Sequence, residues 1–384
     1  MVVRSTGMTE RMQGHENSSR HRRRRWRLCI VAAALLGLGL FAILYFAGGR
    51  SRESLAQRIA AVNAAHVLPP EQNAATIYDQ LVASGVLTGT DPNLMFAAYA
   101  ALVKASGMES CWFPLVPGEQ CYREHGARNL PMRQWMFTLI SLAQTDVMGE
   151  RYDAAVEKLD GLVRMAGHLQ QQLLISDSAV GMAIEVHVWL TWTECVMQED
   201  GAEELLRAAE AIPPDKLANT YKEFSSQVLQ VNALIKESGR AEQTLPRRIE
   251  EWWREIRDPI KSAEENFDRT YLSLLCRRRG VRIVAGLWRY HEANRRWPDS
   301  LDDIKTLVPE QALIDPFTEQ MFVYRKEVGG QFTLYSKGPN EIDDNGLRGG
   351  KADDYRIWPR YGITAPQKGT SQQKERTGGL ERNP

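Results

Sequence analysis

The sequence predicts a mainly α-helical protein with one N-terminal transmembrane helix, an irregular helical bundle and a small C-terminal α+β module that contains a β-hairpin. Three observations predict this fold class. Residues 28–47 form an uncharged apolar run, residues 51–280 place apolar side chains mainly at helical spacing, and residues 321–335 contain two short runs of strand-forming residues around a Gly-Gly pair. A chain of 384 residues is long enough for two or three domains.

The composition is that of a folded protein, with 43% apolar and 25% charged residues. The net charge of zero averages two unlike parts of the chain. Residues 1–27 contain eight Arg and two Glu, a balance of +6, so the remainder carries −6. A mildly acidic body argues against nucleic-acid binding by that part of the protein.

Residues 28–48 are predicted to be a membrane anchor. The run from Leu28 to Ala47 has twenty residues without a charge, and a helix of this length spans about 30 Å, the thickness of the hydrocarbon core. Five Arg lie just before it, at 22–25 and 27. Because such residues stay in the cytoplasm, we expect residues 1–27 to be a disordered cytoplasmic tail and the rest of the chain to lie on the other side of the membrane.

A cleaved signal peptide and a lipid anchor are the two alternatives. A signal peptide has an apolar stretch of about 7–15 residues followed by a small-x-small cleavage site, whereas Tyr45-Phe46-Ala47 places an aromatic residue where a small one is needed. Cys29 lies at the start of the apolar run rather than at its end, which argues against lipid attachment. An uncleaved anchor is therefore the favoured interpretation.

Residues 51–280 are predicted to form a helical domain. Asp91-Pro92 should open one of its helices as N-cap and first residue, and Gly107 should end it. Residues 108–130, with two Pro, two Gly and two Cys, are expected to be non-helical. Further helices are predicted over 51–66, 72–84, 131–148, 151–168, 173–197, 203–212 and, from apolar residues spaced 3, 4, 3 and 4 apart, over 221–235 with Gly239 as its C-cap.

The two helices joined through Gly149-Glu150 resemble a tetratricopeptide hairpin, in which small residues let two helices pack closely. No second copy is evident at the 34-residue period, and an array needs about three. We therefore predict an irregular bundle with one repeat-like hairpin. The residues that carry the resemblance are Leu142, Ala143, Gly149, Tyr152, Ala154, Ala155 and Leu159.

The pattern changes after Gly280, which predicts a separate C-terminal module over 281–362 and a frayed tail over 363–384. A helical face comes first, and Ser300 to Asp303 then forms a capping-box pattern that should open a short helix. The runs 321–325 and 331–335 predict the β-hairpin.

Residues 281–358 resemble the C-terminal half of the major pseudopilin of type II secretion systems. The order of elements carries this resemblance: a helix, then Trp297-Pro298-x-Ser300-Leu301, an Asp315-Pro316 turn, a hairpin, and an acidic loop after Leu334-Tyr335-Ser336-x-Gly338. It covers about a fifth of the chain. The whole chain is similar to a broad class of bacterial membrane-anchored proteins that place this module after a helical domain, which implies location in the bacterial inner (cytoplasmic) membrane.

In the pseudopilins the acidic loop binds Ca²⁺, an ion that takes six to eight oxygen ligands. The resemblance therefore implies a structural calcium site in this chain. The alternative is a solvated acidic surface loop that needs no ion. The implied ligands are the Leu334 carbonyl, Ser336, Asp343, Asp344 and one or both of Asp353 and Asp354.

The chain departs from the pseudopilins at its N-terminal side. Those proteins carry a Gly-Phe processing site before their apolar helix and a Glu five residues into it, whereas Trp26-Arg27 precedes the apolar run here and Leu28 to Leu36 contains no acid. We therefore expect only the globular module to be shared, without pilin-type processing or polymerisation.

Cys111 and Cys121 lie in the segment predicted to be irregular, on the side of the membrane where disulfides persist, and a bridge between them is the favoured interpretation over two free thiols. Cys195 and Cys276 are expected to be core residues. No catalytic or metal-binding motif was found. His187 is expected to lie in the core of the bundle or at its boundary rather than to act as a ligand, and Arg277-Arg278-Arg279 is expected at an exposed helix end.

These features favour an extracytoplasmic interaction or scaffold protein, held by one membrane span and with a protein partner on the external side. A secretion-system accessory role is an alternative. A cell-envelope hydrolase, with carboxylates that only the fold brings together, is a further one that no motif supports.

Overall fold

The computed structural model describes residues 52–85, 92–198, 202–212, 221–240, 263–327, 331–349 and 352–359. The predicted basic tail (1–27), membrane anchor (28–48) and C-terminal tail (363–384) lie outside these residues, as does Asp91, the predicted N-cap. Among the helices that are described, none combines the length and the hydropathy needed to cross a bilayer.

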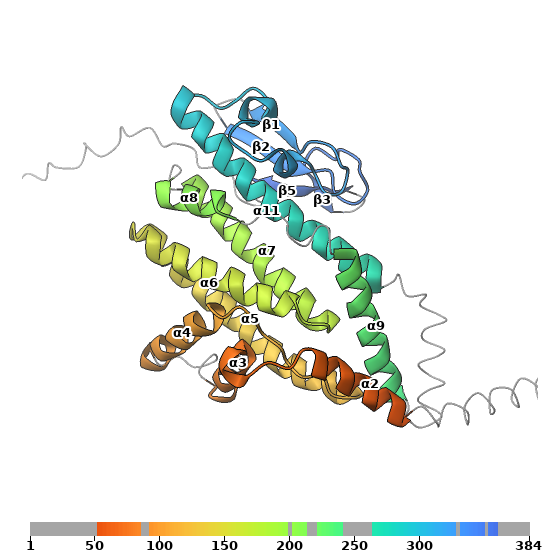
Figure 1. Ribbon diagram of the computed structural model, residues 1–384. Helices are drawn as coiled ribbons and strands as arrows, with labels where there is room; N and C mark the ends of the chain where they lie inside the picture. The colour runs from red at the N-terminus through yellow and green to blue at the C-terminus, as the bar shows by residue number, and fades with distance from the viewer. Residues whose placement is uncertain are drawn as a thin grey trace, which may run out of the picture.

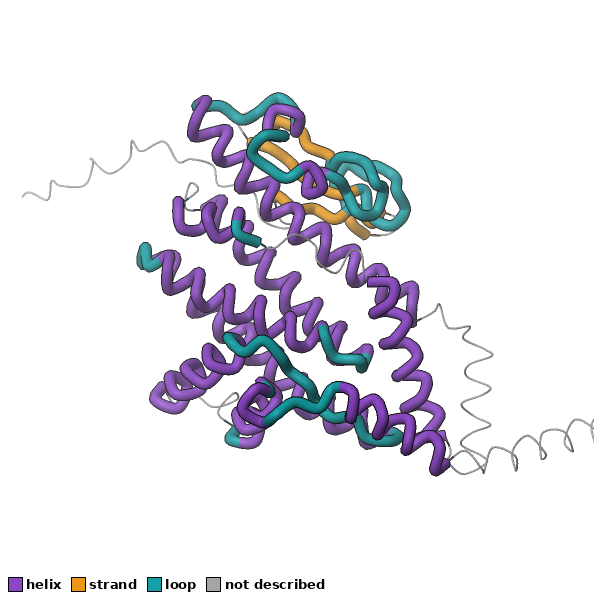
Figure 2. The backbone as a smooth tube through the Cα atoms, in the orientation of Figure 1, coloured by secondary structure: helices purple, strands orange, loops and turns teal. Residues whose placement is uncertain are grey.

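The protein is mainly α-helical, with a small antiparallel sheet near the C-terminus, as the sequence predicts (Figures 1 and 2). Predicted helices within the described ranges are present, and α4 ends just before Gly107 as expected. The helices are α2 (Arg52–Ala65), α3 (Ala74–Ala83), α4 (Pro92–Ser106), α5 (Glu119–Met148), α6 (Tyr152–Gln170), α7 (Ile175–Gln198), α8 (Glu203–Glu210), α9 (Tyr221–Arg240) and α11 (Ala263–Asn294).

The sheet has the strand order β1-β2-β5 and contains the predicted hairpin. Strands β1 (Val323–Glu327) and β2 (Gln331–Ser336) are antiparallel, and Val323 lies opposite Tyr335. Strand β5 (Tyr355–Trp358) pairs with the other edge of β2, and the two-residue strands β3 (Arg348–Gly349) and β4 (Ala352–Asp353) form a separate small ribbon. The predicted capping box is confirmed, because Ser300 and Asp303 cap a short 3₁₀ helix over Leu301–Ile304.

Helix α7 lies at the centre of the bundle. It packs against α5 and α6 on one side and against α11 on the other, and α11 in turn lies between α7 and the sheet (Figure 1). The α5–α6 turn is the predicted one: α5 ends at Gly149, Glu150 has a positive φ of 57°, and Arg151 donates to Asp146. In the described part of the bundle this hairpin is not repeated as a tetratricopeptide array: the helices after α6 are α7, α8 and α9, which differ widely in length.

Helix α5 begins twelve residues before its predicted start at Pro131, so the prediction that residues 119–130 are non-helical was wrong. Pro131 lies inside the helix and removes one backbone N–H donor, which disfavours a helix interior by about 3 kcal/mol. Burial compensates for this cost. Cys121, His125 and Asn129, one turn apart on the first half of α5, are all buried against the rest of the bundle.

Helix α11 also differs from its prediction, because it continues through Gly280, where the boundary between the helical domain and the C-terminal module was expected. Gly280 marks a close contact with the sheet: a Cβ at this position would lie 2.7 Å from Ile357 Cγ2. Gly239 similarly lies inside α9 rather than at its C-cap, and a Cβ there would lie 3.2 Å from Gly118 Cα. Both glycines allow close packing between elements distant in sequence.

The arginines near Gly280 are buried, so their prediction as an exposed helix end was also wrong. Arg277 is 8% exposed and donates to the Arg356 carbonyl in the sheet, whereas Arg279 is 6% exposed and donates to the Ile314 carbonyl at 2.7 Å. Arg282 donates to the carbonyl of Ile212, after α8. Each guanidinium thus supplies donors to a carbonyl of another element, and α11 joins the helical part to the C-terminal module.

Arg278 points the other way and forms an ion pair with Glu185 of α7; the Arg278 side chain is 16% exposed and Glu185 is 1% exposed. Glu185 also accepts hydrogen bonds from Gln170 of α6 at 2.6 Å and from the indole of Trp189 at 2.7 Å. The carboxylate therefore has a charged partner and two further donors, as a buried charge requires. This network connects α6, α7 and α11.

Candidate functional site

The predicted calcium loop connects β2 to β5 and is closed tightly at its base. Gly338 follows β2 with φ of 68°, and a Cβ at this position would lie 2.2 Å from the carbonyl oxygen of Asp353. Only glycine allows this approach, which brings the two ends of the loop together. Gly346, with φ of 72°, donates its N–H to Asp354 at 2.7 Å and turns the chain around that carboxylate.

Three of the predicted ligands lie close together in this loop. Asn340 donates its side-chain amide to Asp344 at 3.0 Å and its N–H to Asp353 at 3.3 Å, and the Asp353 N–H points at the Asp344 carboxylate at 3.4 Å. Asp354 is fully buried. Burial raises the pKa of Asp354, and the neighbouring charges of Asp344 and Asp343 raise it further. A cation beside these carboxylates would offset this repulsion.

The other three predicted ligands are engaged elsewhere. Asp343 accepts hydrogen bonds from the Tyr335 hydroxyl at 2.7 Å and from Arg325 at 2.8 Å. Although burial acts in the opposite direction, these bonds lower its pKa. Ser336 donates to Asp315 at 2.9 Å, and Leu334 lies in the central strand, opposite Tyr324 and Trp358.

The metal-site geometry is therefore incomplete as the loop is folded. Within the described ranges, no three His, Cys, Asp or Glu side chains form a group that could hold a metal ion. Asp344, Asp353 and Asp354 lie on one closed loop and are joined through Asn340 and Gly346, but they do not form such a group there.

Asp315 was predicted only as part of an Asp-Pro turn, yet it organises the start of the calcium loop. It is 1% exposed, and its two oxygens accept hydrogen bonds from the Phe317 N–H, the Ser336 hydroxyl and the Lys337 N–H at 2.9–3.1 Å. The buried thiol of Cys276 also points at it, at 3.8 Å. The sequence contains a local signal for the turn but none for the long-range contacts.

Cys111 and Cys121 are both buried free thiols, so the predicted disulfide is absent from the structure. Cys121 lies in the first turn of α5, whereas Cys111 precedes it in the irregular segment that packs against α3 and α6. Burial raises the pKa of Cys111 far above its usual range, which keeps that thiol protonated. Cys195 and Cys276 are buried, as predicted.

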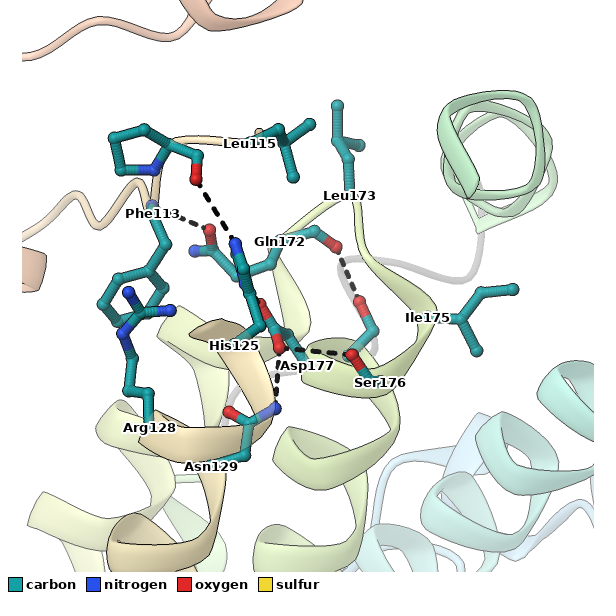
Figure 3. Close-up of polar contacts among 12 residues, drawn as sticks. Phe113, Leu115, His125, Arg128, Asn129, Gln172, Leu173, Ile175, Ser176 and Asp177 are labelled. Atoms are coloured by element: carbon teal, nitrogen blue, oxygen red, sulfur yellow. Dashed lines mark hydrogen bonds and ion pairs between the residues drawn. The ribbon is translucent and has the colours of Figure 1, made fainter. Parts of the chain in front are cut away.

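The structure also brings together a buried polar cluster that the sequence did not reveal. His125 of α5 and Asp177 of α7 are 1% and 0% exposed, and His125 Nδ1 lies 2.5 Å from Asp177 Oδ2. Figure 3 shows His125 and Asn129 pointing at Asp177 from the same face of α5, and Asn129 donates to Asp177 Oδ1 at 2.7 Å. His125 Nε2 points at the carbonyl of Pro114 at 3.3 Å.

Both ring nitrogens of His125 thus face acceptors, which favours the doubly protonated imidazolium. Burial is the largest single effect and opposes this charge, but the hydrogen bond that His125 donates to Asp177, the charge of Asp177 and the contributions of Cys121 together outweigh it, and the pKa of His125 rises to about 9. Cys121, His125 and Asp177 are the residue types of a thiol hydrolase. However, all three side chains are essentially inaccessible to solvent, so the cluster stabilises the α5–α7 contact rather than acting on a substrate.

An apolar surface extends along α5 and the neighbouring part of α7. Leu130, Phe137 and Met148 of α5 are 59%, 52% and 76% exposed. Phe137 and Met148 lie 7 and 18 residues after Leu130, which is close to two and five full helical turns, so the three side chains lie in one row along α5. The Phe137 ring contacts the ring of His187 on α7, with a centroid distance of 5.8 Å.

The half-buried side of α7 continues this surface. His187 is half-buried, as predicted for a boundary residue, and donates to the Ala183 carbonyl at 2.8 Å. We call the combined surface the α5–α7 face. It comprises Leu130, Phe137 and Met148 of α5 and the half-buried Val180, Ala183, Val186, His187 and Leu190 of α7.

Exposed large apolar side chains are concentrated on this part of the molecule. Of the nine in the part of the chain that the structure describes, five belong to α5, and three of these five form the row along the α5–α7 face. The row is interrupted, because exposed Gln134 lies between Leu130 and Phe137, and exposed Ser141 and Gln144 lie between Phe137 and Met148. The spacing of Leu130, Phe137 and Met148 was visible in the sequence, but their exposure was not.

Comparisons of the chain with protein-family models, with curated proteins and with solved structures found no match.

Proposed function

We propose that this protein is a membrane-anchored interaction protein, with residues 28–48 as its anchor and the helical bundle as a scaffold on the external side. The uncharged run and the five preceding Arg support the anchor and its orientation. The α5–α7 face supports the interaction role, because five of the nine exposed large apolar side chains in the described residues lie on α5, and a partner that covers them would remove apolar surface from water.

Photo-crosslinking tests the interaction role. A benzophenone amino acid in place of Phe137 of the full-length protein, irradiated in its own membrane, should give one discrete product with a protein. The same amino acid at Leu307, an exposed apolar residue of the C-terminal module that is 47% exposed, should give none. A second change, Met148→Glu, should remove the product formed at Phe137. Equal products at both positions, or none at Phe137, would contradict the proposal.

We further propose that the loop after β2 binds a structural Ca²⁺, and that Asp344, Asp353 and Asp354, which do not yet form a metal-binding group, draw together around the ion. The buried carboxylate of Asp354, whose pKa is raised by burial and by its acidic neighbours, supports a cation at this place. Binding to the folded state alone stabilises it by mass action, so chelation with EDTA should lower the melting temperature of the full-length protein and added Ca²⁺ should restore it.

Two substitutions make this measurement specific. Asp354→Asn should remove the response to Ca²⁺, whereas Asp343→Asn should keep it, because Asp343 is held by Arg325 and Tyr335. A melting temperature of the unchanged protein that is insensitive to EDTA, together with no bound metal by mass spectrometry, would remove the site.

A further inference from the structure

We infer that residues 111–116, which we call the strap, form a pH-sensitive cover over the buried pair of His125 and Asp177. The cover is closed while His125 carries two ring protons, and it lifts at Pro114 once His125 carries one. The strap runs between α4 and α5 and has neither helical nor strand structure. Pro114 is exposed, yet its carbonyl faces the buried His125 ring, so the chain at Pro114 lies between that ring and solvent.

Side-chain amides hold the strap on both sides of Pro114. Asn73 makes two hydrogen bonds with the backbone of Trp112, donating to its carbonyl at 3.0 Å and accepting from its N–H at 2.9 Å. Asn63 pairs in the same way with Leu115, at 2.7 and 2.9 Å. Amide side chains carry no charge at any of the pH values considered, so these contacts stay the same as the pH rises.

The contact at Pro114, by contrast, depends on the number of protons on His125. The Nε2 atom of His125 lies 3.3 Å from the Pro114 carbonyl oxygen, and Nδ1 lies 2.5 Å from Asp177 Oδ2. A carbonyl and a carboxylate can only accept, so each contact requires a proton on the nitrogen that faces it. A histidine with one proton keeps it on the side of the carboxylate, which is the closer and the charged acceptor.

Loss of the second proton therefore leaves the Nε2 lone pair facing the Pro114 oxygen. Two acceptors that face each other in a buried place are unfavourable, because neither has a hydrogen-bond donor. Lifting the strap at Pro114 removes this contact and lets water donate to both atoms. The opening needs to involve only the middle of the strap, because the amide of Asn73 holds Trp112 independently of His125.

The titratable groups that face His125 come from two helices. Asp177 of α7 holds the second proton on the ring, and Cys121, one turn earlier on α5, contributes in the same direction. On the strap itself the titratable side chain is Cys111. Burial raises the pKa of Cys111 far above its usual range, so this thiol does not change its charge between pH 6.5 and pH 9.

The remaining neighbours act through Phe113 of the strap. Its ring lies edge-on to the His125 ring, with a centroid distance of 6.3 Å (Figure 3). Arg128 of α5 lies over the same ring at 3.8 Å and donates to Asp79 of α3 at 2.7 Å. From α6, the uncharged Gln172 accepts the Phe113 N–H at 3.1 Å. The proton on His125 is therefore the one that changes the contacts of the strap in this pH range.

The direction and size of the effect follow from the proton count. The pKa of His125 is about 9 under the closed strap and returns to about 6.5 when water reaches the ring. Between these values the closed state holds one proton more than the lifted state. Each pH unit in this window shifts the equilibrium about tenfold towards the lifted strap, and the shift ends above about pH 9.

Hydrogen exchange of the full-length protein in detergent, resolved to single amides and expressed as protection factors, tests the inference. The N–H groups of Phe113 and Leu115, on either side of Pro114, should lose protection at least about tenfold between pH 7 and pH 9, and the loss should level off above pH 9. The N–H of Trp112, held by Asn73 on the same strap, should change less than about threefold.

Two variants complete the test. His125→Gln should remove the pH dependence at Phe113 and Leu115, because the new side chain keeps its protons across this range, whereas His168→Gln should retain it. Circular dichroism of both variants checks that the helices remain. Protection that is flat from pH 7 to pH 9, or a pH dependence that survives in His125→Gln, would overturn the inference. An equal loss at Trp112 would also overturn it, because exchange would then follow unfolding of the whole region.

Discussion

The buried pair of His125 and Asp177 should make the stability of this protein depend on pH in the alkaline range. The pKa of His125 rises to about 9 in the folded state, against about 6.5 in an unfolded chain. Between these values the folded state holds one proton more than the unfolded state. The stabilisation is therefore fully present below about pH 6.5 and is lost as the pH rises through about 9.

The magnitude follows from the shift. About 2.5 pKa units at 1.36 kcal/mol each correspond to roughly 3 kcal/mol of unfolding free energy, because both side chains are too buried for solvent screening to reduce the effect. This is a large part of the total stability of a domain. We expect the free energy of unfolding to fall by about this amount between pH 6.5 and pH 9.5.

Urea denaturation of the full-length protein in detergent, followed by tryptophan fluorescence across this pH range, measures the effect. His125→Gln should lower the stability at pH 6.5 and remove the alkaline slope. His168→Gln is a matched control. Burial lowers the pKa of His168, so the contribution of this residue to stability is lost on the acidic side, as the pH falls below about 6.5, and not on the alkaline side. This control should keep the alkaline slope. An unchanged protein whose stability is flat from pH 6.5 to 9.5 would refute the reasoning.

Three further predictions concern packing and orientation. Glu185→Gln removes the charge that pairs with the half-buried Arg278 and should lower the unfolding free energy by about 3 kcal/mol, the lower end for a buried pair, whereas the exposed Glu203→Gln should change it little in the same urea titration. Gly280→Ala should cost about 1–3 kcal/mol by overlap with Ile357, and Ile357→Val in the same chain should recover part of the loss in a double-mutant cycle. Protease added to intact spheroplasts should digest the region after residue 50, and a region cleaved only after lysis would reverse the proposed orientation.

Local elements of this fold were predicted from the sequence because short-range chemistry determines them. The capping box at Ser300 and Asp303, the turn at Gly149 and the hairpin of β1 and β2 each depend on residues within a few positions of one another. The start of α5 was missed for the opposite reason. Pro131 is a strong local signal against a helix, and only the burial of residues distant in sequence outweighs it.

The candidate sites also divide into local features that the sequence predicted and long-range contacts that it did not. The glycines and acids of the loop after β2 are close in sequence, so their proximity in the structure was predictable, whereas the ion pair between Asp343 and Arg325 was not. His125 and Asp177 are 52 residues apart and match no motif. The pairing of such groups depends on how the helices pack against each other, and no residue spacing in a single sequence shows that packing.

Four arginines of α11 connect the helical bundle to the C-terminal module. Arg277 and Arg279 donate to carbonyls of the C-terminal module, Arg278 pairs with Glu185 of α7, and Arg282 donates to a carbonyl after α8. Burying a guanidinium without hydrogen-bond acceptors is unfavourable. The packing of each arginine therefore depends on the element that supplies its acceptor. The C-terminal module is therefore held against the same helix that packs on α7. Since α7 contributes to the α5–α7 face, the same helices position both this face and the loop after β2.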